Sequence, residues 1–127
     1  EMGTGPQDYA FAVFHQPNTK FPRRVGRHLG FTPAQLKAGL LVPVIGNVYA
    51  GSALVGLTAV LDSSHPGDRV LLVSFGSGAG SDAFQLRIGN RQSACSGVVP
   101  STRDYLERRT EIDYSTYVRY RGKLALE

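Results

Sequence analysis

The chain has 127 residues, of which 42% are hydrophobic and 19% are charged, and its formal net charge is +4. This length fits a single domain, and the composition is that of a globular protein and not of a disordered tail. The single cysteine excludes a disulfide framework and a multi-cysteine zinc site, and no apolar run approaches the roughly 20 residues that a membrane span needs.

The first predicted element is a short buried strand at residues 10–14, an apolar run rich in aromatic residues. It leads directly into the polar sequence His15-Gln16-Pro17-Asn18, in which Pro17 ends regular pairing. Proteins of the α/β class place ligand-binding groups at such strand ends. We therefore treat His15 as the first candidate functional residue.

Two helices are predicted next, over residues 18–30 and from Thr32-Pro33 to about residue 39. The N-cap of the first is Asn18 or Thr19, and its buried face is expected to carry apolar residues at intervals of four: Phe21, Val25 and Leu29. The same helix carries a basic cluster, which suits an anionic ligand: Lys20, Arg23, Arg24, Arg27 and His28.

The middle of the chain is nearly free of charge. Residues 40–45 are apolar but contain Pro43, so we expect an irregular or edge segment there, followed by a turn at Gly46-Asn47. Residues 50–61 consist of small and aliphatic residues without any charge, which predicts a helix that is buried on most sides.

The next elements form a predicted hairpin. Residues 69–75 read as a strand covered on both faces, residues 76–80 as a glycine turn, and residues 82–88 as the returning strand. Further along, we expect a loop over 89–100, a helix over 102–109 capped by Ser101, and a Tyr/Arg-rich tail of undetermined structure. The predicted fold class is α/β, with a buried helix packed against a mixed sheet.

Three features at turns and strand ends suggest chemistry: His15, Asn47 and the glycine turn that begins at Gly76. A histidine and an asparagine that converge on one carbonyl oxygen could stabilise an oxyanion, and glycine lets backbone N–H groups approach the same point. Each feature also has a plain structural interpretation. His15 could be a structural histidine, Asn47 a turn residue, and the glycine run an ordinary hairpin turn.

Three motifs resemble those of hydroxymethylglutaryl-CoA synthase, specifically the C-terminal half of its archaeal and related bacterial branch. They are Phe14-His15-Gln16-Pro17-Asn18-Thr19-Lys20, Gly46-Asn47-Val48-Tyr49-Ala50-Gly51-Ser52, and Gly76-Ser77-Gly78-Ala79-Gly80-Ser81-Asp82-Ala83-Phe84. The tail from Asp104 to Lys123 is similar to the end of those proteins. The resemblance implies a thiolase-like fold with the layered αβαβα architecture, comprising a C-terminal half domain at residues 1–90 and a loop and tail at 91–127.

The resemblance also implies a Claisen-type condensation of acetyl-CoA with acetoacetyl-CoA to hydroxymethylglutaryl-CoA in the mevalonate pathway. His15 and Asn47 would be the catalytic residues that bind and orient the acetoacetyl group. The implied substrate-binding residues fall into two sets: Lys20, Arg23 and Arg24 for the coenzyme A phosphates, and Tyr49, Gly76, Ser77 and Gly78 for the acyl pocket. Coenzyme A thioesters are substrates, and neither a cofactor nor a metal is expected.

The family's nucleophilic cysteine and glutamate lie in an N-terminal half that this chain does not contain, and Cys95 is not a substitute because no basic partner or helix N-terminus activates it. We expect a partner polypeptide or segment to supply them, in a cytoplasmic homo- or hetero-oligomer. The resemblance further implies assembly with acetoacetyl-CoA thiolase and a bridging protein with an OB domain, and neither nucleic acid nor membrane is expected as a partner. The alternatives are a ketoacyl synthase III-like or other acyltransferase subunit, or a non-catalytic assembly subunit.

Overall fold

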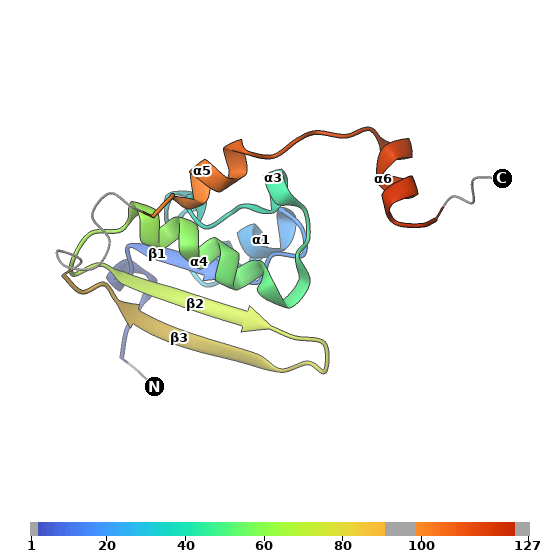
Figure 1. Cartoon of the computed structure of the whole chain (residues 1–127). Coiled ribbons are helices and arrows are strands. Elements are labelled where there is room, and N and C mark those ends of the chain that lie inside the picture. The colour runs from blue at the N-terminus through green and yellow to red at the C-terminus, as the bar shows by residue number, and fades with distance from the viewer. Residues whose placement is uncertain (1–2, 91–98, 124–127) are drawn as a thin grey trace.

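A three-stranded sheet lies at the centre of the molecule, with helices on both of its faces (Figure 1). The computed structural model describes residues 3–90 and 99–123. The strands are β1 (Phe11–Phe14), β2 (Arg69–Phe75) and β3 (Ser81–Arg87), in the order β1-β2-β3. β1 and β2 are parallel, whereas β2 and β3 form an antiparallel hairpin, so the sheet is mixed as predicted.

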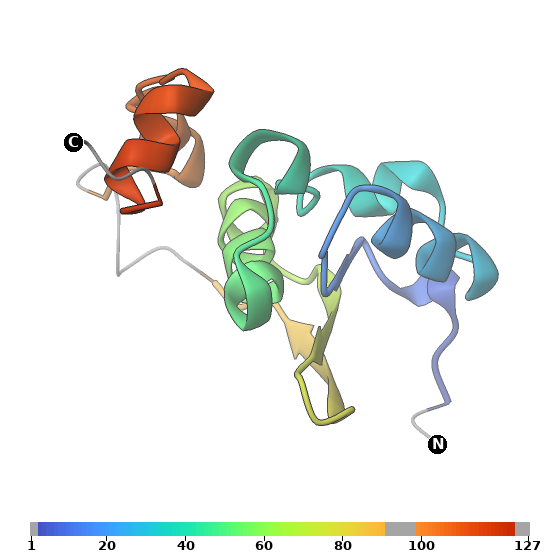
Figure 2. The ribbon, with the colours of Figure 1, turned by 90° about the vertical axis from the view of Figure 1, so that its right-hand side faces the viewer.

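The helices form two covering layers. Their bounds, with two short 3-10 turns included, are η1 Pro6–Asp8, α1 Lys20–His28, α2 Pro33–Lys37, α3 Val42–Ile45, η2 Tyr49–Gly51, α4 Ser52–Ser63, α5 Thr102–Glu107 and α6 Tyr114–Tyr120. Figure 2 shows the pair α1 and α2 on one side of the strands and α4 on the other. The parallel pair β1–β2 is therefore buried between helices.

Each face of the sheet has its own hydrophobic core, because successive side chains of a strand point to opposite faces. The core under α4 contains Val13, Ala53, Val60, Val70, Leu72 and Ile88. The core under α1 and α2 contains Tyr9, Ala12, Phe14, Phe31 and Leu36. This two-sided burial explains the nearly continuous apolar runs in β1 and β2, and it confirms the prediction of a strand covered on both faces.

The buried face of α1 differs from the predicted one. Phe21 and Leu29 are 44% and 49% exposed, whereas Pro22 and Gly26 are buried. The reason is the close approach of α2: a Cβ atom at Gly26 would lie 2.6 Å from Leu36 Cδ1. The helix therefore turns its smallest residue toward its neighbour. Asn18, one of the two predicted caps, accepts hydrogen bonds from the backbone N–H groups of residues 20 and 21.

Two predictions for the apolar middle of the chain are wrong. The segment predicted as irregular contains the short helix α3, whose first turn tolerates Pro43 because an N–H is not needed there. The helix predicted to be buried on most sides is buried along one stripe only, formed by Ser52, Ala53, Gly56 and Val60. Leu54, on another face of α4, is 59% exposed, since nothing within residues 3–90 and 99–123 covers it.

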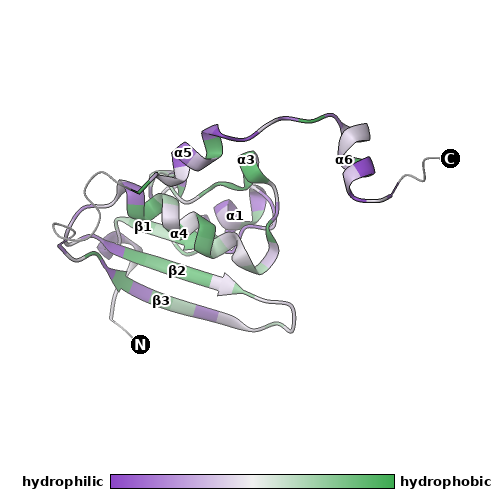
Figure 3. Cartoon of the chain, viewed as in Figure 1, coloured by the Kyte–Doolittle hydropathy of each residue, from purple (hydrophilic) through white to green (hydrophobic). Residues whose placement is uncertain are grey.

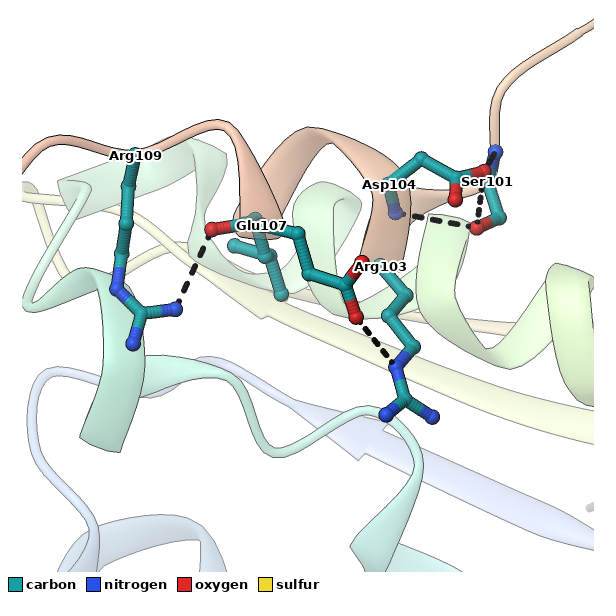
Figure 4. Close-up of polar contacts among 6 residues, drawn as sticks. Ser101, Arg103, Asp104, Glu107 and Arg109 are labelled. Atoms are coloured by element: carbon teal, nitrogen blue, oxygen red, sulfur yellow. Dashed lines mark hydrogen bonds and ion pairs between the residues drawn. The ribbon is translucent and has the colours of Figure 1, made fainter.

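The C-terminal segment confirms the predicted helix after Ser101. The hydroxyl of Ser101 accepts a hydrogen bond from the backbone N–H of Asp104, and the Asp104 carboxylate accepts one from the backbone N–H of Ser101 (Figure 4). α6 forms within the tail, for which no structure was predicted, and it stands away from the sheet (Figure 1). Most of the predicted loop 89–100, with Cys95, lies outside the described residues.

Within residues 3–90 and 99–123, none of the helices has the length and apolar character that a membrane crossing requires.

Candidate active site at the ends of the parallel strands

The candidate site lies where the parallel strands β1 and β2 end. His15 follows β1 directly, and its backbone N–H donates to the carbonyl oxygen of Val73 in β2 over 2.8 Å. The ring centroids of His15 and Phe75 are 5.9 Å apart. Because Phe75 is the last residue of β2, the glycine turn that follows it begins beside the histidine. The structure thus brings together two of the three features singled out in the sequence.

The imidazole of His15 is held by the start of α4. Its Nδ1 atom lies 2.9 Å from Oγ of Ser52, the first residue of that helix. The same hydroxyl oxygen accepts a hydrogen bond from the backbone N–H of Gln16 over 3.1 Å. Ser52 is only 2% exposed, so the serine side of this contact is shielded from water. The half-buried histidine is therefore fixed through one of its two ring nitrogens.

Gln16 ties the site to the layer around it. The side chain is 3% exposed, and its oxygen accepts hydrogen bonds from the backbone N–H groups of Leu41 and Val42, each over 2.9 Å. Its amide nitrogen donates to the carbonyl oxygens of Gly39 and Ser52. A buried amide with all its bonds satisfied rigidifies the groups that it joins. Gln16 therefore fastens the end of β1 to α4 and to the segment before α3.

Sequence reasoning assigned no role to Gln16 or Ser52. The signal that could have identified them is a polar residue next to an apolar segment. Gln16 directly follows a predicted strand, and Ser52 lies near the start of the uncharged segment 50–61.

Asn47 lies in the loop that leads into Ser52. Its side-chain oxygen accepts a hydrogen bond from the backbone N–H of Tyr49 over 2.8 Å, and Tyr49 has a positive φ of 52°. Asn47 is five residues before Ser52, which contacts His15, so the chain can place it at most about 18 Å from Ser52. Among the described residues no contact joins it to His15. Asn47 is exposed, and within the described part of the chain no hydrogen bond uses its side-chain N–H groups.

The glycine turn joins β2 to β3 as predicted. Gly78 has a φ of 118°, a conformation that favours glycine, and the backbone N–H of Gly76 donates to the carbonyl oxygen of Gly80 over 3.0 Å. Ser77 and Gly78 are exposed, whereas Gly76 is half-buried next to Phe75.

The three basic residues singled out on α1 are all exposed, and among the described residues none of them forms an ion pair. They are Lys20, Arg23 and Arg24. Arg23 also lines a groove of about 410 Å³ between α1, α2 and α3, whose floor is apolar and whose other cation is Lys37. A second groove, of about 490 Å³, lies between α4 and α5. Neither groove is lined by His15 or Asn47.

The described residues contain no group of three or more histidine, cysteine, aspartate or glutamate side chains that could hold a metal ion.

Comparison with known families places this geometry in context. The family model described as 3-oxoacyl-[acyl-carrier-protein (ACP)] synthase III C terminal matches residues 1–88. The hydroxymethylglutaryl-CoA synthase of Methanocella arvoryzae is 48% identical over 123 residues, and that of Thermococcus kodakarensis is 50% identical over 126. These alignments cover 97% and 99% of this chain but 35% and 36% of the relatives. The chain thus spans about a third of the length of these curated relatives.

Solved structures agree on the fold. A structure described as hydroxymethylglutaryl-CoA synthase complexed with CoA matches 93% of this chain and 34% of its own, with a TM-score of 0.68 and 24% identity. The structure of smu.943c from Streptococcus mutans matches 91% of this chain and 35% of its own, with a TM-score of 0.67 and 25% identity. These findings confirm the resemblance to the C-terminal part of hydroxymethylglutaryl-CoA synthase and the thiolase-like α/β fold class.

Proposed function

The chain belongs to the family of 3-oxoacyl-[acyl-carrier-protein] synthase III C-terminal domains, and on this premise we propose that it is the C-terminal catalytic part of a hydroxymethylglutaryl-CoA synthase. The reaction condenses acetyl-CoA with acetoacetyl-CoA in the mevalonate pathway. The observation that carries the proposal is sequence identity of 48–50% to named synthases over nearly the whole chain. The attachment of His15 to the start of α4, at the end of the parallel strands, supports it.

In this proposal His15 and Asn47 act on the ketone oxygen of acetoacetyl-CoA. The acetyl group is carried on a cysteine of the remaining two-thirds of the enzyme, where a glutamate removes a proton from its methyl group. The resulting carbanion forms a carbon–carbon bond with the ketone carbon, and the electron pair of the C=O bond moves to oxygen. Hydrogen bonds from His15 and the Asn47 amide stabilise this alkoxide, which then takes a proton from the glutamate. Water finally cleaves the thioester to cysteine and releases the product.

The substrate-binding assignments follow the same geometry. Lys20, Arg23 and Arg24 extend from the exposed face of α1, where cations can meet the phosphates of coenzyme A. The turn at Gly76, Ser77 and Gly78 would form the floor of the acyl pocket, next to Phe75 and His15. Tyr49, whose side chain is exposed in the loop before α4, would line the same pocket.

Exposed apolar side chains near the site support the need for a further polypeptide segment. Val44, Val48, Leu54 and Phe75 are all exposed in this chain, although they lie along α3, the loop before α4, α4 itself and the end of β2. Exposed hydrophobic side chains on several elements are what a surface covered by another polypeptide would show. We propose that the part carrying the nucleophilic cysteine packs here.

The remaining assignments rest on the family. Residues 1–90 would form the thiolase-like domain and residues 91–127 a loop and tail. The working enzyme would be a cytoplasmic oligomer without a cofactor, assembled with acetoacetyl-CoA thiolase and an OB-domain protein.

The replacement His15→Ala tests this function in the complete enzyme, with the cysteine-bearing part present. We expect condensation to fall by about 10²-fold or more, because a donor to the developing alkoxide is lost, while acetylation of the cysteine continues. His65→Ala is the matched control, since His65 is exposed in the turn between α4 and β2, at the opposite end of β2 from Phe75. Unchanged condensation by His15→Ala would contradict the proposal and favour a non-catalytic assembly subunit.

A second candidate is a condensing subunit of the ketoacyl synthase III type with another acyl acceptor, and the description of the matching family model favours it. Product analysis with acetoacetyl-CoA and with malonyl-acyl carrier protein separates the two functions. Conversion of only the malonyl substrate would establish the second.

A further inference from the structure

We propose that Ser52 is a positioning residue that sets the tautomer of His15, by donating its hydroxyl proton to Nδ1 and leaving the proton of the neutral ring on Nε2. This inference deepens the proposed function and rests on it for the use that the enzyme makes of His15. The hydrogen-bonding pattern itself is a property of the folded chain.

Counting protons around the Ser52 hydroxyl identifies the donor. The oxygen already accepts a hydrogen bond from the backbone N–H of Gln16, which uses one lone pair. The hydroxyl has one proton to donate, and among the described residues the only acceptor within hydrogen-bond distance is Nδ1 of His15. In the opposite arrangement Nδ1 would carry a proton, and the serine hydroxyl would have no acceptor. A buried donor without an acceptor is strongly disfavoured.

The position of the hydroxyl is fixed from two sides. Gln16 holds Ser52 through its backbone N–H to the hydroxyl and through its side-chain amide to the Ser52 carbonyl oxygen, over 3.1 and 3.2 Å. The neighbouring residue of Gln16 is His15 itself, so the strand end and the helix start are joined at consecutive residues. Close packing between α4 and the segment before α3 prevents the helix from sliding: a Cβ atom at Gly56 would lie 2.6 Å from the Gly39 carbonyl oxygen.

This arrangement determines what His15 can do. With Nδ1 occupied as an acceptor, Nε2 carries the proton and can only donate while the ring is neutral. A donor is what the ketone oxygen of an acyl acceptor requires, and a general base is not. Ser52 thus selects oxyanion stabilisation over proton abstraction as the chemistry of His15.

The tautomer can be observed directly by long-range ¹H–¹⁵N correlation in the ¹⁵N-labelled 127-residue chain, at a pH where the imidazole is neutral. The His15 signals are assigned by their loss in His15→Gln. We expect the Nε2-protonated tautomer to dominate by about tenfold or more in the wild type, because a penalty of roughly 1.4 kcal/mol corresponds to tenfold. In Ser52→Ala this preference should fall toward a mixture.

The controls keep the experiment decisive. Ser63→Ala removes a hydroxyl from the same helix whose partner is the carbonyl oxygen of Ala59, and it should leave the His15 tautomer unchanged. Ser52→Cys keeps the shape of the side chain, with a somewhat larger atom, while weakening the donor, so it replaces Ser52→Ala if that variant does not fold. A wild-type ring protonated at Nδ1, or an undiminished Nε2 preference in the Ser52 variant that folds, would overturn the inference.

Condensation assays on the complete enzyme distinguish this inference from the function on which it rests. Ser52→Ala should lower kcat for condensation about twofold or more, without slowing acetylation of the cysteine, because an equal mixture of tautomers leaves about half of the rings without the donor. A wild-type enzyme that forms no hydroxymethylglutaryl-CoA contradicts the proposed function but not the tautomer. Full activity of Ser52→Ala, in an enzyme that depends on His15, contradicts the role of Ser52 alone.

Discussion

The layered α/β part of the chain and its C-terminal helical segment are stabilised in opposite ways. Every buried hydrophobic residue described lies between Tyr9 and Ile88. In residues 99–123 most large hydrophobic and aromatic side chains are exposed, with Tyr114 at 79% and Tyr120 at 75%. Figure 3 shows hydrophobic residues concentrated on β1, β2, α3 and α4, whereas α5 and α6 are mostly neutral or hydrophilic. The first region depends on contacts between distant residues, and the second on contacts within a few residues of sequence.

Local hydrogen bonds define the two C-terminal helices. The carboxylates of Asp104 and Asp113 cap the beginnings of α5 and α6, and Arg103 pairs with Glu107 over 3.0 Å (Figure 4). Exposed ion pairs of this kind contribute little to stability. Among the described residues, two hydrogen bonds of Thr102 tie α5 to α4: its backbone N–H donates to a carboxylate oxygen of Asp62 over 2.7 Å, and its hydroxyl donates to Oγ1 of Thr58 over 3.0 Å. The comparison therefore predicts that damage to one region leaves the other largely intact.

The largest effect on the layered region is expected from Gln16→Leu. The replacement leaves the buried backbone N–H of Val42 without a partner, and it reduces Leu41 N–H and the Gly39 carbonyl to their mutual hydrogen bond of 3.2 Å. A buried group left unpaired costs roughly 1–3 kcal/mol, and each further hydrogen bond lost adds about 1 kcal/mol. We expect the free energy of unfolding to fall by about 3 kcal/mol or more in urea titrations. Gln7→Leu, at an exposed position, is the control. Equal stability of the two variants would show that the network does not hold the layers together.

A smaller effect is expected from Gly56→Ala. The added methyl group would lie 2.6 Å from a backbone oxygen and 2.9 Å from Val13 Cγ1, so α4 must move away from the sheet. Overpacking of this kind costs about 2 kcal/mol, measurable as a lower midpoint of thermal or urea unfolding. Gly89→Ala, where a Cβ atom meets no neighbour within 4 Å, should change stability little. A stable Gly56 variant would indicate that α4 is less tightly packed than described.

The smallest expected effect is a loss of helix stability at acidic pH, and it should be confined to the C-terminal segment. Hydrogen bonds from Ser101 lower the pKa of Asp104 below its usual 3.8, and those from Thr116 and Ser115 lower that of Asp113. Because the pKa of each aspartate is lowered in the folded state, its ionised form stabilises the helix at pH values above the usual pKa. This stabilisation is lost as the pH falls through the lowered pKa. Amide signals of α5 and α6 should therefore lose protection below pH 3.8 before those of β2.

The control for the acid experiment is Asp82→Asn, because Asp82 lies in β3 and caps no helix. In this variant, as in the wild type, the amides of α5 and α6 should lose protection before those of β2. If the amides of β2 lost protection before those of α5 as the pH falls, the expected difference between the two regions would be contradicted.

The sequence predicted those elements that depend on local signals. Thr32 and Ser101 mark helix starts because their hydroxyls accept backbone hydrogen bonds three residues later, and β2 was predicted with its observed bounds. The exposed face of α1 and the partly covered α4 were not predicted, because burial depends on which surface packs against a helix. Apolar spacing alone favoured Phe21 and Leu29, whereas the approach of Leu36 selected Gly26.

The candidate site was predicted in part for the same reason. The sequence identified His15 and the glycine turn, since strand ends and glycine runs are visible in a single segment. The contact between His15 and Ser52 joins residues 37 positions apart, and the bonds of Gln16 span similar separations. Such partners become apparent only when the end of β1 and the start of α4 are seen in space.

The parallel pairing of β1 with β2 has a consequence for how the chain folds. Val73 lies almost 60 residues after its partner Phe14, whereas β2 and β3 are joined by a short turn. Long loops close slowly, and hairpins form within microseconds. The β2–β3 hairpin should therefore form before β1 pairs with β2. The hydrogen bonds around His15 would then be among the last parts of the molecule to form, at the moment when β1 docks.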